Sequence, residues 1–164
     1  MPQQDERHFG KYRGVVTNNI DPMMLGRLQV KVPAVLGENS LNWAMPAVPY
    51  AGNQVGIFFI PPVGANIWVE FEAGNKDYPI WSGCFWGTGE LPTPTGVPQT
   101  KMIKTDTVTI TLDDLIPNTI KLETTQGMKI VIEASGITID NGMGAKIELT
   151  GPQVSVNSGA LEVI

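Results

Sequence analysis

The stretch MKIVIEASGITID, residues 128–140, decides the fold of this chain. Apolar and polar residues alternate in it on both sides of the turn-forming pair Ser135-Gly136. A period of two is typical of a β-strand that has one apolar face and one polar face. The stretch therefore predicts two short strands joined by a turn, with no helical stripe.

The same pattern extends from Val108 to Val163 and recurs at roughly seven- to ten-residue intervals. Turn-forming residues separate the bursts: Pro117-Asn118, Gln126-Gly127, Ser135-Gly136, Asn141-Gly142 with Gly144, Gly151-Pro152 and Ser158-Gly159. No helical pattern accompanies the bursts to cover their apolar face. A short single sheet is not stable alone in water. We therefore expect identical copies of the segment to bury this face.

Eight apolar residues of the repeating segment are predicted to form the core of this association. Burying about ten such side chains per chain contributes roughly 15–30 kcal/mol before chain entropy opposes it. The eight are Ile130, Ile132, Ile137, Ile139, Ile147, Leu149, Val154 and Val156.

The front half of the chain also reads as strands without helices between them. About five strands in some eighty residues predict a small closed barrel, so the whole chain is expected to be all-β. The expected strands are Tyr12–Asn18; Gly26–Val32, with Leu28, Val30 and Val32 inward; Leu41–Val48 as an edge strand or extended loop; Val55–Ile60, buried on both sides; Asn66–Glu72, with Ile67, Val69 and Phe71 on one face; and Tyr78–Trp86.

Composition shifts indicate four parts. Residues 1–10 form a polar N-terminal arm, and residues 11–87 form the barrel. Residues 88–100 are rich in Thr, Pro and Gly and are expected to be a linker. Residues 101–164 are the repeating segment.

Composition also excludes some functions. The net charge of −5 argues against a nucleic-acid partner, because that affinity depends on clustered Lys and Arg. No apolar run is long enough to span a bilayer, and the N-terminus lacks a signal-peptide core. We expect synthesis in the cytoplasm without a signal peptide. The only cysteine, Cys84, excludes an internal disulfide.

Residues suited to catalysis are scarce. The only histidine, His8, is expected to be solvated in the arm, and Cys84 is expected to be a buried structural thiol. The chain cannot supply a common zinc site, so no metal and no cofactor are predicted. Asp113-Asp114 is interpreted as a polar turn rather than a calcium site. Glu70 and Glu72 are expected to share the outer face of a strand, where solubility is a better explanation than a glycosidase pair.

Aromatic residues are concentrated in the barrel half. Exposed aromatics on such barrels can stack bases or sugars, but core packing accounts for most of them. Trp68 is out of phase with Ile67, Val69 and Phe71, and we expect it to face a neighbouring subunit. The aromatic set is Trp43, Phe58, Phe59, Trp68, Trp81, Phe85 and Trp86.

Several segments resemble one known family. They are Tyr12–Val16, Gly26–Pro33, Phe58–Gly64, Val69–Asn75, Tyr78–Gly83, Ile103–Thr105 and Thr109–Asp114. Their order and spacing resemble the central spike proteins of contractile tails. These include the phage baseplate V type and the valine–glycine-repeat spikes of type VI secretion and related injection systems.

The resemblance implies an oligonucleotide/oligosaccharide-binding-type (OB) barrel followed by an intertwined trimeric β-helix, the needle. It implies a homotrimer that docks on the baseplate hub and is driven through the target envelope when the sheath contracts. Hydrogen bonds between the three chains are expected to stiffen the shaft. The chain departs from some relatives because only the linker stands where they carry a muramidase domain.

The needle contains no histidine, whereas some relatives bind a metal at the apex through a His-x-His motif. A separate tip protein of the proline–alanine–alanine–arginine (PAAR) type is therefore expected at its C-terminal end. We predict a structural, non-enzymatic spike in a virion tail baseplate or at the tip of an injection particle. The alternatives are an OB-fold module that binds oligonucleotides or glycans, and a cell-wall hydrolase.

Overall fold

The computed structural model describes residues 6–38, 42–93, 96–115 and 119–163. The chain divides into two compact units, residues 1–90 and 91–164, which we call the barrel unit and the needle unit. The predicted turn at Pro117-Asn118 and the first half of the predicted arm lie outside the described residues. In the described ranges, no helix is long and apolar enough to cross a membrane.

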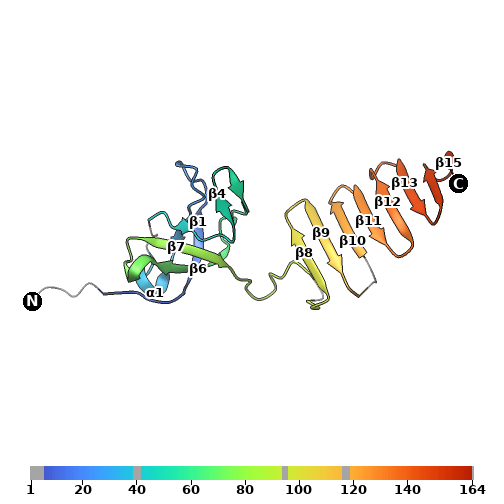
Figure 1. Cartoon of the computed structure of the whole chain (residues 1–164). Coiled ribbons are helices and arrows are strands. Elements are labelled where there is room, and N and C mark those ends of the chain that lie inside the picture. Colours follow the sequence, from blue (N-terminus) through green and yellow to red (C-terminus); the bar gives the residue numbers. More distant parts are fainter. Residues whose placement is uncertain (1–5, 39–41, 94–95, 116–118, 164) are drawn as a thin grey trace, which may run out of the picture. The chain divides into compact units, whose positions relative to one another are not determined.

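The barrel unit is built on a five-stranded sheet with the order β2-β1-β6-β7-β3 (Figure 1). The bounds are β1 Tyr12–Asn18, β2 Gln29–Lys31, β3 Met45–Pro46, β6 Asn66–Phe71 and β7 Pro79–Cys84. A separate hairpin pairs β4 (Ala51–Gly52) with β5 (Val55–Gly56), and two short helices, α1 (Pro33–Leu36) and the 3-10 helix η1 (Glu72–Gly74), complete the unit.

The two edges of this sheet meet. Leu28, just before β2, and Ala44, just before β3, form an antiparallel bridge with N···O distances of 3.1 and 2.7 Å. This bridge links the edge strands β2 and β3, so the sheet curls back on itself around its apolar face. The predicted edge strand within residues 41–48 corresponds to β3.

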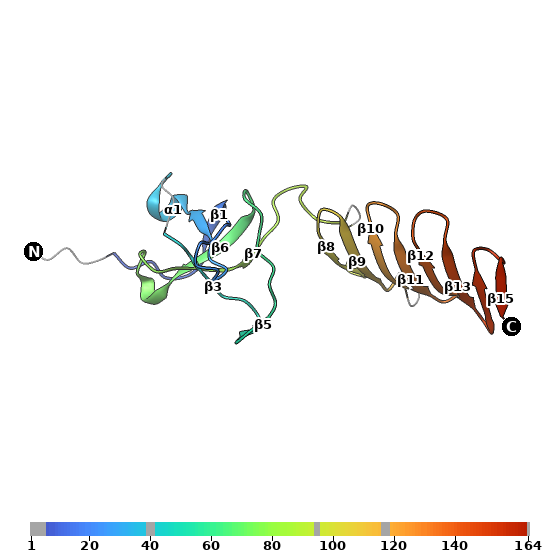
Figure 2. The same ribbon diagram turned by 90° about the horizontal axis from the view of Figure 1, so that it is seen from above.

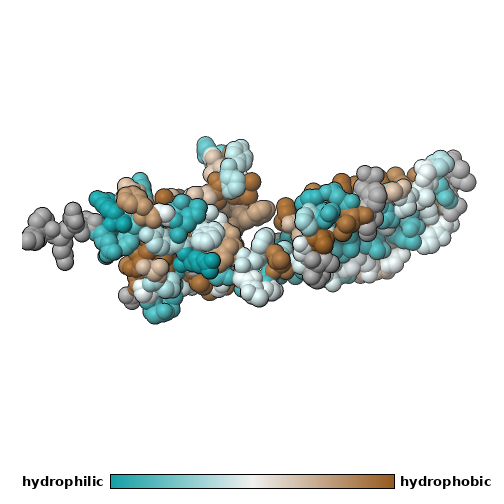
Figure 3. All heavy atoms as spheres, turned by 90° about the horizontal axis from the view of Figure 1, so that it is seen from below, coloured by the Kyte–Doolittle hydropathy of each residue, from teal (hydrophilic) through white to brown (hydrophobic). Residues whose placement is uncertain are grey.

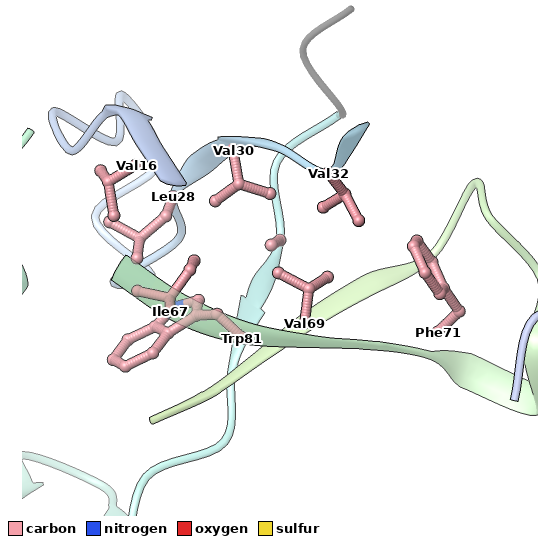
Figure 4. Packing of buried hydrophobic residues seen from close by; sticks show 9 residues of the cluster. Val16, Leu28, Val30, Val32, Ile67, Val69, Phe71 and Trp81 are labelled. Atoms are coloured by element: carbon pink, nitrogen blue, oxygen red, sulfur yellow. The ribbon is translucent and has the colours of Figure 1, made fainter. Parts of the chain in front are cut away.

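The barrel core consists largely of residues that the alternation of apolar and polar residues predicted to face inward. Strand β6 shows strict alternation of half-buried and buried residues, with Ile67, Val69 and Phe71 inside. Gly14 of β1 lets the strands approach closely, because a Cβ there would lie 3.0 Å from the Lys31 carbonyl oxygen. Figure 4 shows the core side chains pointing toward one another: Val16, Leu28, Val30, Val32, Ile67, Val69, Phe71 and Trp81.

A partly buried ion pair fixes the loop between β1 and β2. The Asp21 carboxylate accepts a hydrogen bond from the Arg27 guanidinium at 2.6 Å, and its side chain is 4% exposed. It also accepts backbone N–H groups from Met23, Leu25 and Arg27. The Arg27 hydrogen bond, aided by these N–H groups, holds the pKa of Asp21 well below its ordinary range. Arg27 in turn lies over the Trp43 ring, 5.3 Å from its centroid.

One predicted strand of the barrel is wrong. Residues 55–60 were expected to form a strand buried on both sides, but only Val55–Gly56 is a strand, and residues 55–59 are all exposed. The turn at Asn53-Gln54 directs β5 away from the main sheet, and Pro61-Pro62 cannot continue a ladder because proline lacks an N–H. Figure 2 shows the β4–β5 hairpin projecting from the unit.

Three smaller expectations for the barrel are also corrected. Strand β6 ends at Phe71, and Glu72 begins η1, so Glu70 and Glu72 do not share a strand face. Cys84 is exposed rather than buried, because it stands at the end of β7. His8 is half-buried rather than solvated. Its ring centroid lies 5.9 Å from that of Phe71, and its backbone N–H donates to the Gly74 carbonyl oxygen at 2.8 Å.

We predict that Val69→Ala lowers the free energy of unfolding of the barrel by about 2–3 kcal/mol, because it removes two fully buried methyl groups and leaves a cavity. The matched variant Val63→Ala changes an exposed side chain and is expected to cost less than about 0.5 kcal/mol. Denaturant unfolding followed by tryptophan fluorescence reports on this unit alone, because all four tryptophans lie in it. Equal losses in the two variants would contradict the assigned core.

Candidate trimer interface

The needle unit is one eight-stranded antiparallel sheet in which consecutive strands are neighbours (Figure 1). The bounds are β8 Thr100–Lys104, β9 Val108–Asp113, β10 Thr119–Thr124, β11 Lys129–Glu133, β12 Gly136–Asp140, β13 Lys146–Thr150, β14 Gln153–Val156 and β15 Leu161–Val163. From β8 to β15 the backbone ladder therefore forms within one chain. This corrects the expected source of stiffness, because the ladder between these strands needs no hydrogen bonds from another chain. The intertwining of three chains remains a prediction about the assembly.

Glycines at the turns allow the strands to lie this close. A Cβ on Gly136 would collide with the carbonyl oxygen of Leu149 on β13. Gly142 has a φ of 72°, and a Cβ there would lie 2.9 Å from the carbonyl oxygen of Gln126. The Asn141-Gly142 turn thus packs on the Gln126-Gly127 turn, and only glycine fits at position 142.

Apolar side chains on one face of the needle sheet form two rows, which we call the apolar face. Residues paired across neighbouring strands share a face of the sheet, so the register defines the rows. The first row is Ile103, Ile110, Leu122, Ile130, Ile139, Ile147, Val156 and Leu161. The second is Leu112, Ile120, Ile132, Ile137, Leu149 and Val154.

The opposite face of the sheet is polar. Lys121 pairs with Glu123 at 2.7 Å and Lys146 with Glu148 at 3.0 Å, each two residues apart on one strand. Such exposed pairs contribute little to stability, but they show which face meets water. Two apolar residues also lie on this face: Val131, which stands between Lys121 and Thr138, and Met102, which pairs with Thr111. Figure 3 shows one side of this unit, with teal and white atoms over its lower part and brown atoms along its upper margin.

The apolar face is only half covered by its own chain. Side chains of its inner strands, such as Leu112 and Leu149, are 47% and 37% exposed. Neighbouring side chains of the same sheet already bury the rest of each side chain. Association would therefore bury only the exposed part, which is about half of it. That contributes about 1 kcal/mol per side chain, less than the sequence-based estimate, which assumed full burial.

The structure places all eight sequence-predicted core residues on the apolar face, four in each row. Their role in a trimer core remains a prediction. The set omitted six residues that the register adds to the rows: Ile103, Ile110, Leu112, Ile120, Leu122 and Leu161. For four of the six, the alternation of apolar and polar residues in the sequence already indicated the apolar face: Ile110, Leu112, Ile120 and Leu122. Ile103 follows Met102, so the local pattern did not assign its face.

The remaining candidate residues do not assemble into a catalytic site. His8 packs near Phe71, whereas Cys84 lies near Phe59 and Pro61, so the two do not meet. Although Cys84 is exposed, neighbouring atoms remove part of the water around its thiol, which raises the pKa and makes the thiol a poorer nucleophile. Glu70 binds Lys11 at 3.1 Å, and hydrogen bonds from Lys11 and Ser82 lower its pKa. A glycosidase acid requires a raised pKa.

The acidic pair in the needle and the barrel tryptophan have structural contacts. Asp113 ends β9 and accepts the Leu115 N–H at 2.9 Å, and Asp114 binds Lys101, as in a polar turn. In the described residues, no group of His, Cys, Asp and Glu is placed to hold a metal ion. Trp68 packs on Phe85 with centroids 4.7 Å apart, and its predicted contact with a neighbouring subunit stays a prediction.

Both units match known family descriptions. Residues 12–86 match the type VI secretion system/phage-baseplate injector OB domain. Residues 100–162 match the phage baseplate V C-terminal trimerisation domain. The two matched domains together define a baseplate protein of such injectors, and this chain belongs to the phage baseplate V family. A comparison with curated proteins found no match to the chain. The family membership confirms the resemblance and the all-β fold class, and it supports a homotrimer.

We predict that Ile132→Asp abolishes the trimer, because it places a charge from every copy in a shared apolar core. Val131→Asp is the matched control, since it changes the next residue on the opposite, polar face of the same strand. Sedimentation velocity at low micromolar concentration should find monomers for the first variant and trimers for the second. Trimers of Ile132→Asp, or loss of trimers only with Val131→Asp, would reverse the assignment of the faces.

Proposed function

We propose that this chain is the central spike of a contractile injection machine, which docks on the baseplate hub and is driven through the target envelope. A structural role in the baseplate follows from the family. One observation carries the finer proposal: the needle sheet has an apolar face that its own chain leaves half exposed and a polar face suited to water. Three such sheets with their apolar faces together form a shaft that is dry inside and soluble outside.

The strand arrangement suits a shaft under load. In an antiparallel sheet the hydrogen bonds lie perpendicular to the strands. In the needle unit the strands lie side by side from β8 to β15 (Figure 1), so the hydrogen bonds run along the length of the unit. A force along that length acts on every ladder in turn, and the several hydrogen bonds of each ladder bear it together.

We propose two further protein partners, one for the barrel unit and one for the last strand of the needle unit. The barrel unit is the part that would dock on the hub. Strand β15 pairs only with β14 in the described sheet, and its other edge is a place for a PAAR-type tip protein. The target envelope is a transient partner, and the net charge of −5 disfavours nucleic acid. The spike would stand in a phage tail baseplate or at the tip of a related injection particle.

Particles assembled with variant chains test the mechanical role. We expect particles carrying Val131→Asp to deliver their contents as the parent does, and particles carrying Ile132→Asp to lose at least about 100-fold in delivery, because their shaft cannot form. Delivery is measured as infection or as leakage of target cells, and particle assembly is checked by electron microscopy. Unchanged delivery by complete Ile132→Asp particles would refute the puncturing role.

An assay on purified peptidoglycan tests the non-enzymatic reading. We expect no release of soluble fragments by the trimer, because Glu70 is held ionised by Lys11 and Cys84 is not near a base. A muramidase serves as the positive control. Turnover that Glu70→Gln abolishes would establish a hydrolase instead.

A further inference from the structure

The β4–β5 hairpin and the residues after it form an apolar arm, residues 49–59, which we call the barrel arm. Every residue of the arm is exposed. Its large side chains include Phe58 and Phe59, which are 78% and 66% exposed. The sequence carries no charged residue between Glu38 and Glu70, so the arm has no charges to keep it in water. Depletion of charge together with exposed aromatics is typical of an interface core.

The arm stands beside a second exposed apolar element, the loop between β1 and β2. Met24 at its tip is 91% exposed, and Leu25 is 48% exposed. The arm and this loop line a groove of about 490 Å³ whose floor includes Val48 and Trp81 and whose lining contains no charged residue. Figure 3 shows the hairpin protruding, pale and teal at its tip and brown at its base.

The loop is held in place rather than free to collapse onto the barrel. The buried Asp21 carboxylate binds the N–H groups of Met23, Leu25 and Arg27 and the Arg27 side chain. Met24 adopts a φ of 54°, which is uncommon for a residue with a side chain. A preorganised apolar surface loses less entropy on binding, which favours a docking role.

A second copy of this chain is the partner that best fits the arm. A two-stranded hairpin is marginally stable in water, and this one has no extensive packing against another strand or helix in the described part of its barrel. The trimerisation domain of the same chain holds three barrels together, so each arm meets a neighbouring barrel at an effective concentration near millimolar. A cyclic trimer requires two different complementary surfaces on each copy. The Phe58-Phe59 end of the arm and the Met24-Leu25 loop are two such surfaces, because they come from different segments of the chain and both are exposed.

We propose that the barrel arm of each copy packs on the next copy in the trimer, with Phe58 and Phe59 against its Met24-Leu25 loop. Contacts of this kind would close a ring of three barrels. The inference rests on the homotrimer and not on hub docking or puncturing, so its failure leaves those proposals standing.

Photo-cross-linking in the full-length trimer tests the inference. Phe58→p-benzoylphenylalanine should give covalent dimers and trimers on irradiation, with cross-links that map to residues 20–27 of another copy. The same photoreactive residue at Phe9, which is 71% exposed in the polar arm, is the control and should give none. Intact trimers that yield no cross-links between copies from position 58 would overturn the proposal.

Hydroxyl-radical footprinting of the unmodified chain provides a second readout if the photoreactive variant fails to fold. We expect Met24, Phe58 and Phe59 to be oxidised several-fold more slowly in the parent trimer than in the Ile132→Asp monomer, and Phe9 to be oxidised equally in both. Equal oxidation of Phe58 in trimer and monomer would show that the arm is free in the trimer. A hub protein or a lipid surface would then be its partner, and the proposal would be wrong.

Discussion

The needle sheet has two continuous rows of Ile, Leu and Val whose side chains are only about half covered by the described residues of their own unit. Its backbone groups are paired from strand to strand within one chain, so hydrogen bonding sets no demand for a partner. The apolar side chains are what require a partner surface. Because the hydrophobic effect scales with the area removed from water, a face of this length is satisfied only by another large apolar surface, and a second needle sheet has a matching one.

The barrel unit, in contrast, buries most of its inward-facing apolar side chains by itself. Its apolar residues converge on a core of their own, and the Leu28–Ala44 bridge joins the edges of the sheet around it. The unit can therefore keep its fold whatever the needle does. This separation suits the proposed role as a spike, because a barrel with an independent core would hold a fixed attachment while the proposed shaft depends on assembly.

The exposed arm adds a second place where apolar surface exceeds what the chain can bury. An uninterrupted apolar run such as residues 55–60 has the same composition whether it is destined for its own core or for another molecule's surface. The turn before it and the prolines after it place it outside the barrel. The Asp21–Arg27 ion pair also contributes to this exposed apolar surface, because it fixes the conformation of the loop that carries Met24 and Leu25.

The sequence by itself determined most of the strands and the faces of most of them. Alternation with a period of two is a local property, so Ile67, Val69 and Phe71, and the eight needle residues from Ile130 to Val156, could be assigned to one face each. Burial depends on what packs against a face, which no local pattern contains. Only the tertiary structure decided that residues 55–59 are exposed, that Cys84 is accessible, that His8 packs on Phe71 and that Ile103 joins the first row. Each of these outcomes depends on contacts between segments far apart in the chain or on the register between strands.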